Sequence, residues 1–215
     1  YDYVVELDSP IYEANDLTGS FTINHQNTKI EAFDASIYYG GSYSAVLRDE
    51  NGNVIANRDV YLTVNGQTTK GRTNGQGVVA FNVAVPAGLY GAKISFIGDD
   101  ESIESSKNVN LVVKSTIEFS SNTYTLNSKY LATLRDSSGQ LLINKKIDVI
   151  FNGVSYSLIS DGKGQISLNV KLNPGTYTVK ITNPVTGETN SQSINVVKRI
   201  TQNKGLTAYY GAGKS

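Results

Sequence analysis

The chain has 215 residues, and its 19 basic and 19 acidic side chains cancel. No run of basic residues provides the positive footprint on which nucleic-acid binding rests, and none predicts a basic helix on a membrane surface. There is no cysteine, so neither disulfides nor thiolate-bound metal can support the fold, and the single histidine, His25, offers little basis for a zinc site or for histidine catalysis.

The first strands predicted along the chain are residues 1–7 and 19–23, separated by a polar loop. Their pattern is similar to the last two strands of the segments that follow, for example 90–96 and 108–112. We therefore expect residues 1–27 to be the terminal strands of an upstream repeat. Since the chain opens at Tyr1, we expect it to be part of a longer array.

The next predicted unit covers residues 28–113. Apolar residues alternate at Tyr43, Ala45 and Leu47, which is the pattern of a strand with one buried face. Turns rich in Gly, Asn and Asp recur about every ten residues, as in an antiparallel β-sandwich. The dipeptide Asn65-Gly66 predicts a two-residue hairpin, because both residues tolerate positive φ.

Residues 114–198 repeat this unit at a spacing of 87 residues. Tyr43 returns as Tyr130, and Asn65-Gly66 returns as Asn152-Gly153. The shared positions are turn residues and alternating apolar residues, whereas residues that could perform chemistry are almost absent from the shared set. This split favours tandem structural modules over an enzyme.

The last segment, residues 199–215, contains Thr207-Ala208-Tyr209-Tyr210-Gly211, which is similar to Ser36-Ile37-Tyr38-Tyr39-Gly40. We expect it to be the first strand of a downstream repeat. Isolated strands expose unpaired backbone groups, so the two ends are expected to pair with a neighbouring repeat or to exchange between molecules.

Four residues are predicted to be structural. Tyr90 and Tyr177 each follow a Gly turn at the start of a strand, where the ring can pack inward and the hydroxyl can bond to nearby backbone. Gly66 and Gly153 are the hairpin glycines. We expect the two tyrosines to anchor the core of their modules.

Asp99, Asp100 and Glu101 are weak candidates for a calcium site, because Ca²⁺ binds oxygen ligands. The second unit has no acidic equivalent near Asn183, which weakens the case for a calcium site. No metal site and no cofactor are therefore assigned.

Catalysis is not predicted. The sequence has no Gly-x-Ser-x-Gly elbow, and no carboxylate pair recurs between the units. Lys93 and Lys180 occupy equivalent strand positions and raise the question of a self-formed amide with Asn108 or Asn195. The buried acid that such chemistry needs is not evident, and exposed lysines explain the spacing equally.

Tyr38, Tyr39, Tyr209 and Tyr210 form two pairs in which alternation places one ring inward and one outward. The outward ring could stack on a sugar or a partner, or pack on the adjoining repeat at the hinge. These four residues are the predicted interaction surface.

Five elements of the sequence form a family pattern: Tyr38-Tyr39-Gly40, Tyr130 to Asp136 with Gly139, Asn152-Gly153, Asp161-Gly162-Lys163-Gly164 and Pro174 to Val179. Together they resemble the immunoglobulin-like repeats of adhesin-like surface proteins of methanogenic archaea. Bacterial Ig-like stalk repeats share much of this pattern. The resemblance implies an extracellular, cell-surface protein built from tandem Ig-like β-sandwiches, with no catalytic residues.

The function expected from the sequence is therefore that of a non-enzymatic structural or adhesive segment. Its partners would be the neighbouring repeats of the same chain, and a glycan or protein of a host or a cell wall. The alternative is a carbohydrate-binding module for such glycans, although the absence of tryptophan weakens this hypothesis. No nucleic-acid partner is expected.

Overall fold

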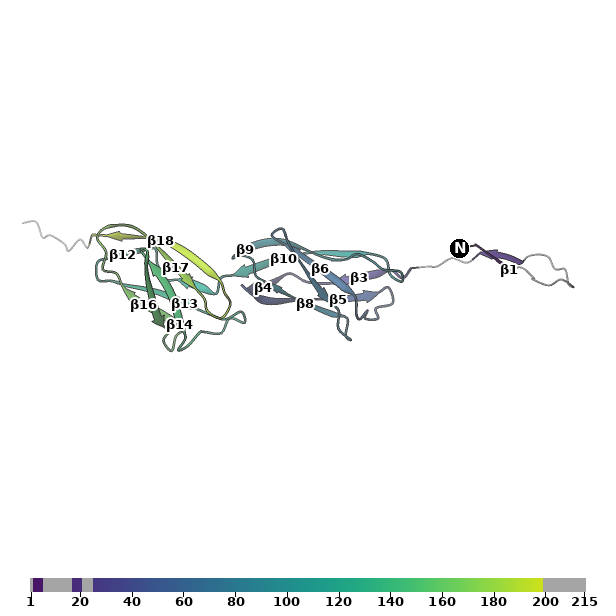
Figure 1. The fold of residues 1–215 in the computed structure, drawn as a ribbon, viewed down its shortest axis with the longest axis horizontal. Coiled ribbons are helices and arrows are strands. Elements are labelled where there is room, and N and C mark those ends of the chain that lie inside the picture. The colour runs from purple at the N-terminus through teal and green to yellow at the C-terminus, as the bar shows by residue number, and fades with distance from the viewer. Residues whose placement is uncertain (1, 6–16, 21–24, 199–215) are drawn as a thin grey trace, which may run out of the picture. The chain divides into compact units, whose positions relative to one another are not determined.

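The computed structural model describes residues 2–5, 17–20 and 25–198. Within these ranges the chain consists of strands and turns and contains no helix (Figure 1). Eight strands lie between residues 28 and 114, and eight more between residues 117 and 197. The all-β fold class predicted from the alternation of apolar residues is confirmed, and the strands form immunoglobulin-like β-sandwiches.

The first eight of these strands divide between two sheets. Their bounds, from β3 to β10, are Thr28–Glu31, Ala35–Tyr38, Gly41–Asp49, Asp59–Val64, Gln67–Arg72, Val78–Val83, Gly88–Phe96 and Ser105–Lys114. One sheet has the order β3-β5-β8, and the other has the order β4-β10-β9-β6-β7. The second and larger sheet therefore ends at β7.

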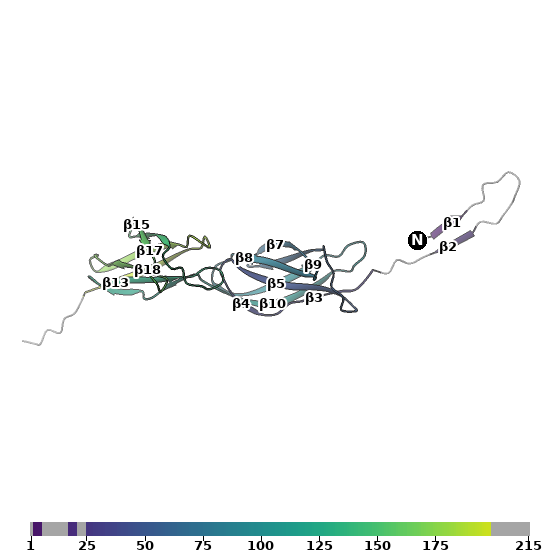
Figure 2. The same ribbon diagram turned by 90° about the horizontal axis from the view of Figure 1, so that it is seen from below.

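The other eight strands repeat this arrangement. Their bounds, from β11 to β18, are Ile117–Phe119, Thr123–Thr125, Lys129–Leu134, Lys146–Phe151, Val154–Ile159, Gln165–Asn169, Gly175–Thr182 and Thr189–Val197. The sheets have the orders β11-β13-β16 and β12-β18-β17-β14-β15. Figure 2 shows β13 of the smaller sheet beneath β17 and β18 of the larger one, as two layers. Each strand thus has a counterpart at the same place in the sheet order.

The sheets differ from the antiparallel expectation at one place in each copy. β4 pairs with β10 in parallel, and β12 pairs with β18 in parallel. The cause is a change of sheet, since the chain leaves the smaller sheet after β3 or β11 and continues in the same direction beside the last strand. Alternation along a strand reveals its faces but not its neighbours, so this pairing was not predictable.

Two-residue turns close the equivalent hairpins. β6 pairs with β7 so that Val64 is opposite Gln67, and β14 pairs with β15 so that Phe151 is opposite Val154. The connecting residues have positive φ in both copies: 49° and 73° at Asn65-Gly66, and 50° and 77° at Asn152-Gly153. These are the backbone angles that Asn and Gly adopt at low cost.

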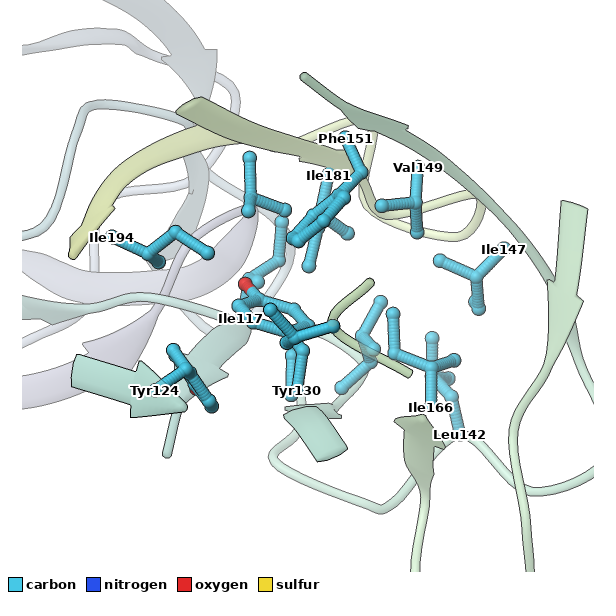
Figure 3. Close-up of a cluster of buried hydrophobic side chains, with 14 of the residues drawn as sticks. Ile117, Tyr124, Tyr130, Leu142, Ile147, Val149, Phe151, Ile166, Ile181 and Ile194 are labelled. Atoms are coloured by element: carbon cyan, nitrogen blue, oxygen red, sulfur yellow. The ribbon is translucent and has the colours of Figure 1, made fainter. Parts of the chain in front are cut away.

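The interior of the second set of sheets is a single apolar cluster. Figure 3 shows Tyr130 and Phe151 in contact among aliphatic side chains, with Tyr124 to one side. The Tyr130 ring centroid lies 5.5 Å from that of Tyr124 and 5.8 Å from that of Phe151. The residues that fill the interior are Ile117, Tyr124, Tyr130, Ala132, Leu134, Leu142, Ile147, Val149, Phe151, Ile166, Val170, Val179, Ile181, Ile194 and Val196.

Buried positions recur between the copies at the 87-residue spacing. The buried pairs are Tyr43 and Tyr130, Val60 and Ile147, Leu62 and Val149, Val64 and Phe151, Val79 and Ile166, and Ile94 and Ile181. A buried hydroxyl recurs as well: Thr73 Oγ1 accepts a hydrogen bond from the backbone N–H of Arg58 at 2.9 Å, and Ser160 Oγ accepts one from that of Lys145 at 3.0 Å. Because apolar burial is the main stabilising term, both copies rest on the same interior pattern.

Near the N-terminus, β1 (Asp2–Val5) pairs with β2 (Leu17–Ser20) in an antiparallel two-stranded sheet. The register places Asp2 opposite Ser20. This antiparallel pairing is also that of the last two strands of the second set, β17 and β18. The predicted downstream strand, residues 199–215, lies outside the described residues.

Candidate functional site

The acidic loop predicted as a weak calcium site connects β9 to β10. Here Oδ2 of Asp99 lies 2.5 Å from Nε of Arg58, and Oε2 of Glu101 lies 2.6 Å from Nη2 of the same guanidinium. Asp100 is exposed on the same loop. Arg58 therefore already neutralises two of the three carboxylates, and a cation would have to compete with it. Among the described residues, no three His, Cys, Asp or Glu side chains gather closely enough to hold a metal ion.

The first tyrosine pair lies at the end of β4. Nζ of Lys114 lies 5.5 Å from the centroid of the Tyr38 ring, which is a cation–π distance, and the backbone N–H of Tyr39 donates to the carbonyl oxygen of Lys114 at 2.8 Å. Both tyrosines are half-buried. The other two residues of the predicted interaction surface, Tyr209 and Tyr210, lie outside the described residues.

Tyr90 and Tyr177 bond to the turn that precedes them. The hydroxyl of Tyr90 donates to the carbonyl oxygen of Pro86 at 2.8 Å, and that of Tyr177 donates to the carbonyl oxygen of Asn173 at 2.9 Å. Both rings are half-buried at the rim of their sheet. Tyr177 packs against the interior cluster of the second copy, in which Tyr130, a residue not predicted to be structural, is fully buried.

His25, Lys93 and Lys180 are all exposed. An amide crosslink requires a lysine held next to its acceptor in a water-free interior, which is not the environment of these two lysines. Within the described ranges, the side chain of His25 has no carboxylate or hydroxyl partner that would make it a base.

A hollow of about 430 Å³ lies on the larger sheet of the first copy. Its residues come from β6, β9 and β10 and from the hairpin turn: Thr63, Asn65, Gly66, Gly91, Ala92, Lys93, Asn108, Val109 and Asn110. Thr63 pairs directly with Lys93 in the register of β6 and β9. A Cβ at Gly91 would meet no atom within 4 Å, so the missing side chain leaves the centre of the face open. At the equivalent position, the second copy carries Thr178.

Asp34 is bound to Asn110, which lines this hollow. The backbone N–H of Asn110 donates to Oδ1 of Asp34 at 2.7 Å, and the Asn110 amide nitrogen donates to Oδ2 at 3.2 Å. The backbone bond, followed by the side-chain bond, lowers the pKa of the Asp34 carboxyl. The hollow thus offers amides, a hydroxyl and an ammonium group, which can hydrogen-bond a hydroxylated ligand, but no nucleophile beside a base.

A buried polar cluster in the second copy was not predicted. The carboxylate of Glu188, which is 5% exposed, accepts bonds from the backbone N–H of Thr116 at 2.6 Å, the Thr116 hydroxyl at 2.5 Å and the Ser115 hydroxyl at 2.7 Å. Asn183 donates to the Thr116 hydroxyl at 2.8 Å and to the carbonyl oxygen of Arg135 at 2.7 Å. The cluster fixes the two residues between β10 and β11, which is a positioning role rather than a chemical one.

No family model matches the chain, and no curated protein matches it. Among solved structures it is similar to the fibronectin(III)-like modules of Clostridium thermocellum CbhA, with 14% identity, 80% of this chain and 94% of that chain covered, and a TM-score of 0.28. It is also similar to a Ca²⁺-stabilised, ice-binding adhesin of an Antarctic bacterium, with 15% identity, coverages of 93% and 57%, and a TM-score of 0.26.

A third similar structure is the Bacteroides ovatus protein SGBP-B in complex with a mixed-linkage heptasaccharide, with 14% identity, coverages of 92% and 53%, and a TM-score of 0.32. The chain spans about half the length of this protein and of the Antarctic adhesin. Likeness at this level concerns the fold of the modules. The described ranges contain no helix with the length and hydrophobicity that a membrane span requires.

Proposed function

We propose that this chain is a non-enzymatic structural and adhesive segment of a cell-surface, adhesin-like protein. In this proposal residues 28–113 and 114–198 are two immunoglobulin-like modules of a stalk, 1–27 ends an upstream repeat and 199–215 begins a downstream one. The protein would be extracellular, of the kind that methanogenic archaea carry on their surface. Its first partners would be neighbouring repeats of the same chain.

The observation that supports this function is the repetition of framework without repetition of chemistry. Sheet order, hairpin turns, buried positions and the tyrosine-to-turn bond recur in both copies. The polar features that could bind a ligand do not recur: Arg58 with its two carboxylates belongs to the first copy only, and the buried Glu188 to the second only. An array selected for length and stability retains its framework and lets its surface diverge.

The junction between β10 and β11 supports a mechanical role. Only Ser115 and Thr116 separate Lys114, the last residue of β10, from Ile117, the first of β11. Both are hydrogen-bonded to Glu188, and Ser115 Oγ also bonds to Ile117. A two-residue connection with fixed side chains has few freely rotating bonds, whereas a flexible linker would be longer and rich in Gly and Ser.

Single-molecule stretching of the full chain tests the stalk function. Two force peaks are expected, each releasing about 300 Å of chain, because a module of this size extends by about 3.6 Å per residue. A single peak for the whole chain, or extension without peaks, would contradict two independent load-bearing modules. The variant Leu62→Ala, in the interior of the first copy, should lower one peak and leave the other unchanged.

The alternative function, glycan binding, is favoured by the hollow around Gly91, whose lining includes Thr63, Asn65 and Asn108. Amide and hydroxyl groups on an open sheet face can hydrogen-bond sugar hydroxyls, although the residues that line this hollow include no aromatic platform. A glycan array with the full chain tests this, and Gly91→Thr is the matched variant because the second copy carries Thr178 at this position. Binding lost in this variant favours a glycan module, and binding at background level favours the stalk.

A further inference from the structure

Strand β15 is the edge of its five-stranded sheet, and its composition is unusual for an edge. It has the sequence Val-Ser-Tyr-Ser-Leu-Ile over Val154–Ile159, with no charged residue and no proline. Val154 is 53% exposed and Ile159 is 72% exposed. Exposed edges of this composition are templates for pairing with another strand.

The turn geometry identifies which backbone groups face outward. Phe151 and Val154 close a two-residue hairpin and therefore form a hydrogen-bonded pair. Hydrogen-bonded pairs alternate along the ladder, so Val154, Tyr156 and Leu158 bond to β14. Ser155, Ser157 and Ile159 then point their N–H and C=O groups away from the sheet, which leaves six unpaired groups along the edge.

The equivalent edge of the first copy is protected. At the 87-residue spacing, Lys70 of β7 corresponds to Ser157, and Arg72 corresponds to Ile159. Nζ of Lys70 lies 2.7 Å from Oδ2 of Asp59, and Nη1 of Arg72 lies 3.7 Å from Oδ1 of the same residue. Two like charges on an edge repel a second copy of that edge, and lysine is a common device for this purpose. β15 carries neither charge at the same place in its sheet.

An apolar groove lies beside β15. Its volume is about 380 Å³, and its apolar walls are Phe151, Val154, Tyr156, Leu168 and Leu172, with Asn152, Asn169 and Lys171 as its polar lining. Tyr156 and Leu158 belong to the core-facing side of β15 and pack against the interior cluster. A strand added at this edge would continue the sheet and bring its own core-facing side chains over the groove.

We infer that β15 is a homotypic docking edge, on which the β15 strand of a second copy pairs in antiparallel orientation. A second copy is the occupant that fits, because an uncharged strand meets no repulsion from itself and offers the same three outward residues. With Ser157 opposite Ser157 of the second copy, Ser155 faces Ile159 and all six groups are paired. In this register Tyr156 is opposite Leu158, and both lie on the core-facing side.

This association does not depend on the proposed stalk function. It would join chains side by side through the second module, whereas the expected pairing of the chain ends would join them through residues 1–27 or 199–215. The two modes are separable by a change in β15 alone.

Sedimentation equilibrium of the full chain over a concentration series tests the inference. The expected result is a mass that rises from 23.2 kDa toward twice that value. Ser157→Lys places the residue found in β7 at the centre of the contact, and it should lower the association constant by at least about tenfold because two lysines would face each other. Asp148 is directly opposite Ser157 in β14, so the new lysine has an intramolecular partner and the fold should be retained.

Thr178→Lys is the matched control, since it adds the same charge to an exposed position on the middle strand β17 and should leave the dimer intact. Hydrogen exchange locates the contact: the amides of Ser155, Ser157 and Ile159 should become protected as concentration rises. A chain that stays monomeric, a dimer that survives Ser157→Lys, or a dimer without this protection would each overturn the inference.

Discussion

The backbone N–H of Thr116 donates a hydrogen bond to Oε2 of Glu188 over 2.6 Å, although 72 residues separate the two in the sequence. The Thr116 hydroxyl and the Ser115 hydroxyl bond to the same carboxylate. A carboxylate that accepts several donors in a buried site is a strong acceptor, because each bond is charge-assisted. This contact ties the start of the second module to the loop that precedes its last strand.

Glu188→Ala is expected to lower the free energy of unfolding of the second module by about 2 kcal/mol, because the Thr116 N–H would remain buried without a partner. Glu104→Ala is the matched control: Glu104 stands directly before β10 as Glu188 stands before β18, but it is exposed. It should change stability by less than about 0.5 kcal/mol. Chemical denaturation of both variants measures the difference. Equal effects would mean that Glu188 is not a positioning residue.

Tyr177→Phe should destabilise the second module by about 1 kcal/mol, because it removes the bond from the hydroxyl to the Asn173 carbonyl oxygen and keeps the ring. Tyr90→Phe should have an effect of the same size on the first module. Tyr156→Phe is the control, since its hydroxyl makes no hydrogen bond within the described residues. Thermal unfolding measures the three variants. If Tyr156→Phe lowers the melting temperature as much as Tyr90→Phe and Tyr177→Phe do, the hydroxyls of Tyr90 and Tyr177 do not anchor their turns.

The sequence predicts these strands because each buries one face, so that alternation at Tyr43, Ala45 and Leu47 identifies both the strand and its inner side. The hairpins follow from Asn65-Gly66 and Asn152-Gly153, whose conformations are local. The alternation also gives the inward phase of Tyr130, since it lies in register with Ala132 and Leu134, and this signal could have found it.

The parts that escaped prediction depend on distant neighbours. Tyr177 is in the inward phase with Val179 and Ile181 and packs against the interior cluster, but alternation alone does not tell that the sheet rim leaves it half-buried. Glu188 resembles any surface carboxylate until Thr116 and Ser115 are placed beside it. The exposed edge at β15 becomes visible only when the strand order is known, because a charge-free strand in a sheet centre would be unremarkable.

Tyr130→Phe is expected to leave the second module as stable or to stabilise it by about 1 kcal/mol. The Tyr130 hydroxyl is buried and has no hydrogen-bond partner within the described residues, and such a group pays a desolvation cost on folding. Tyr130→Leu, which also removes the ring contacts with Tyr124 and Phe151, should destabilise instead. Denaturant unfolding separates the two. Strong destabilisation by Tyr130→Phe would show that the Tyr130 hydroxyl has a hydrogen-bond partner.

The raised pKa of Tyr130 predicts that the second module loses stability at alkaline pH. Burial raises the pKa of the Tyr130 hydroxyl above its ordinary value of 10.0, with a smaller contribution from Tyr124. Because the unfolded chain releases this proton first, the contribution of Tyr130 to stability is complete below pH 10 and declines as the pH rises further. Tyr130→Phe should therefore lose less stability between pH 9 and pH 11. A parallel decline in both proteins would contradict the prediction.

Acid sensitivity is predicted for one turn of the second module and not for its equivalent. Oδ1 of Asp161 accepts backbone N–H bonds from Lys163 at 2.8 Å and from Gln165 at 2.9 Å, and the Gln165 bond is the larger cause of its lowered pKa. At the same place in the first copy, Oδ1 of Asn74 accepts the N–H of Gln76 and of Val78.

A carboxyl whose pKa is lower in the folded state contributes stability above its ordinary pKa of 3.8, and this contribution is lost as the pH falls through the folded value. Asp161→Asn keeps the acceptor oxygen and removes the proton site, so it should flatten the acid limb of the second module's stability curve. Asn74→Asp should steepen that limb for the first module. Unfolding followed from pH 6 to pH 2 measures both. The two turns make the same hydrogen bonds, one with a carboxylate oxygen and the other with an amide oxygen. If neither exchange alters the acid limb, the charge of the Asp161 carboxylate does not contribute to stability.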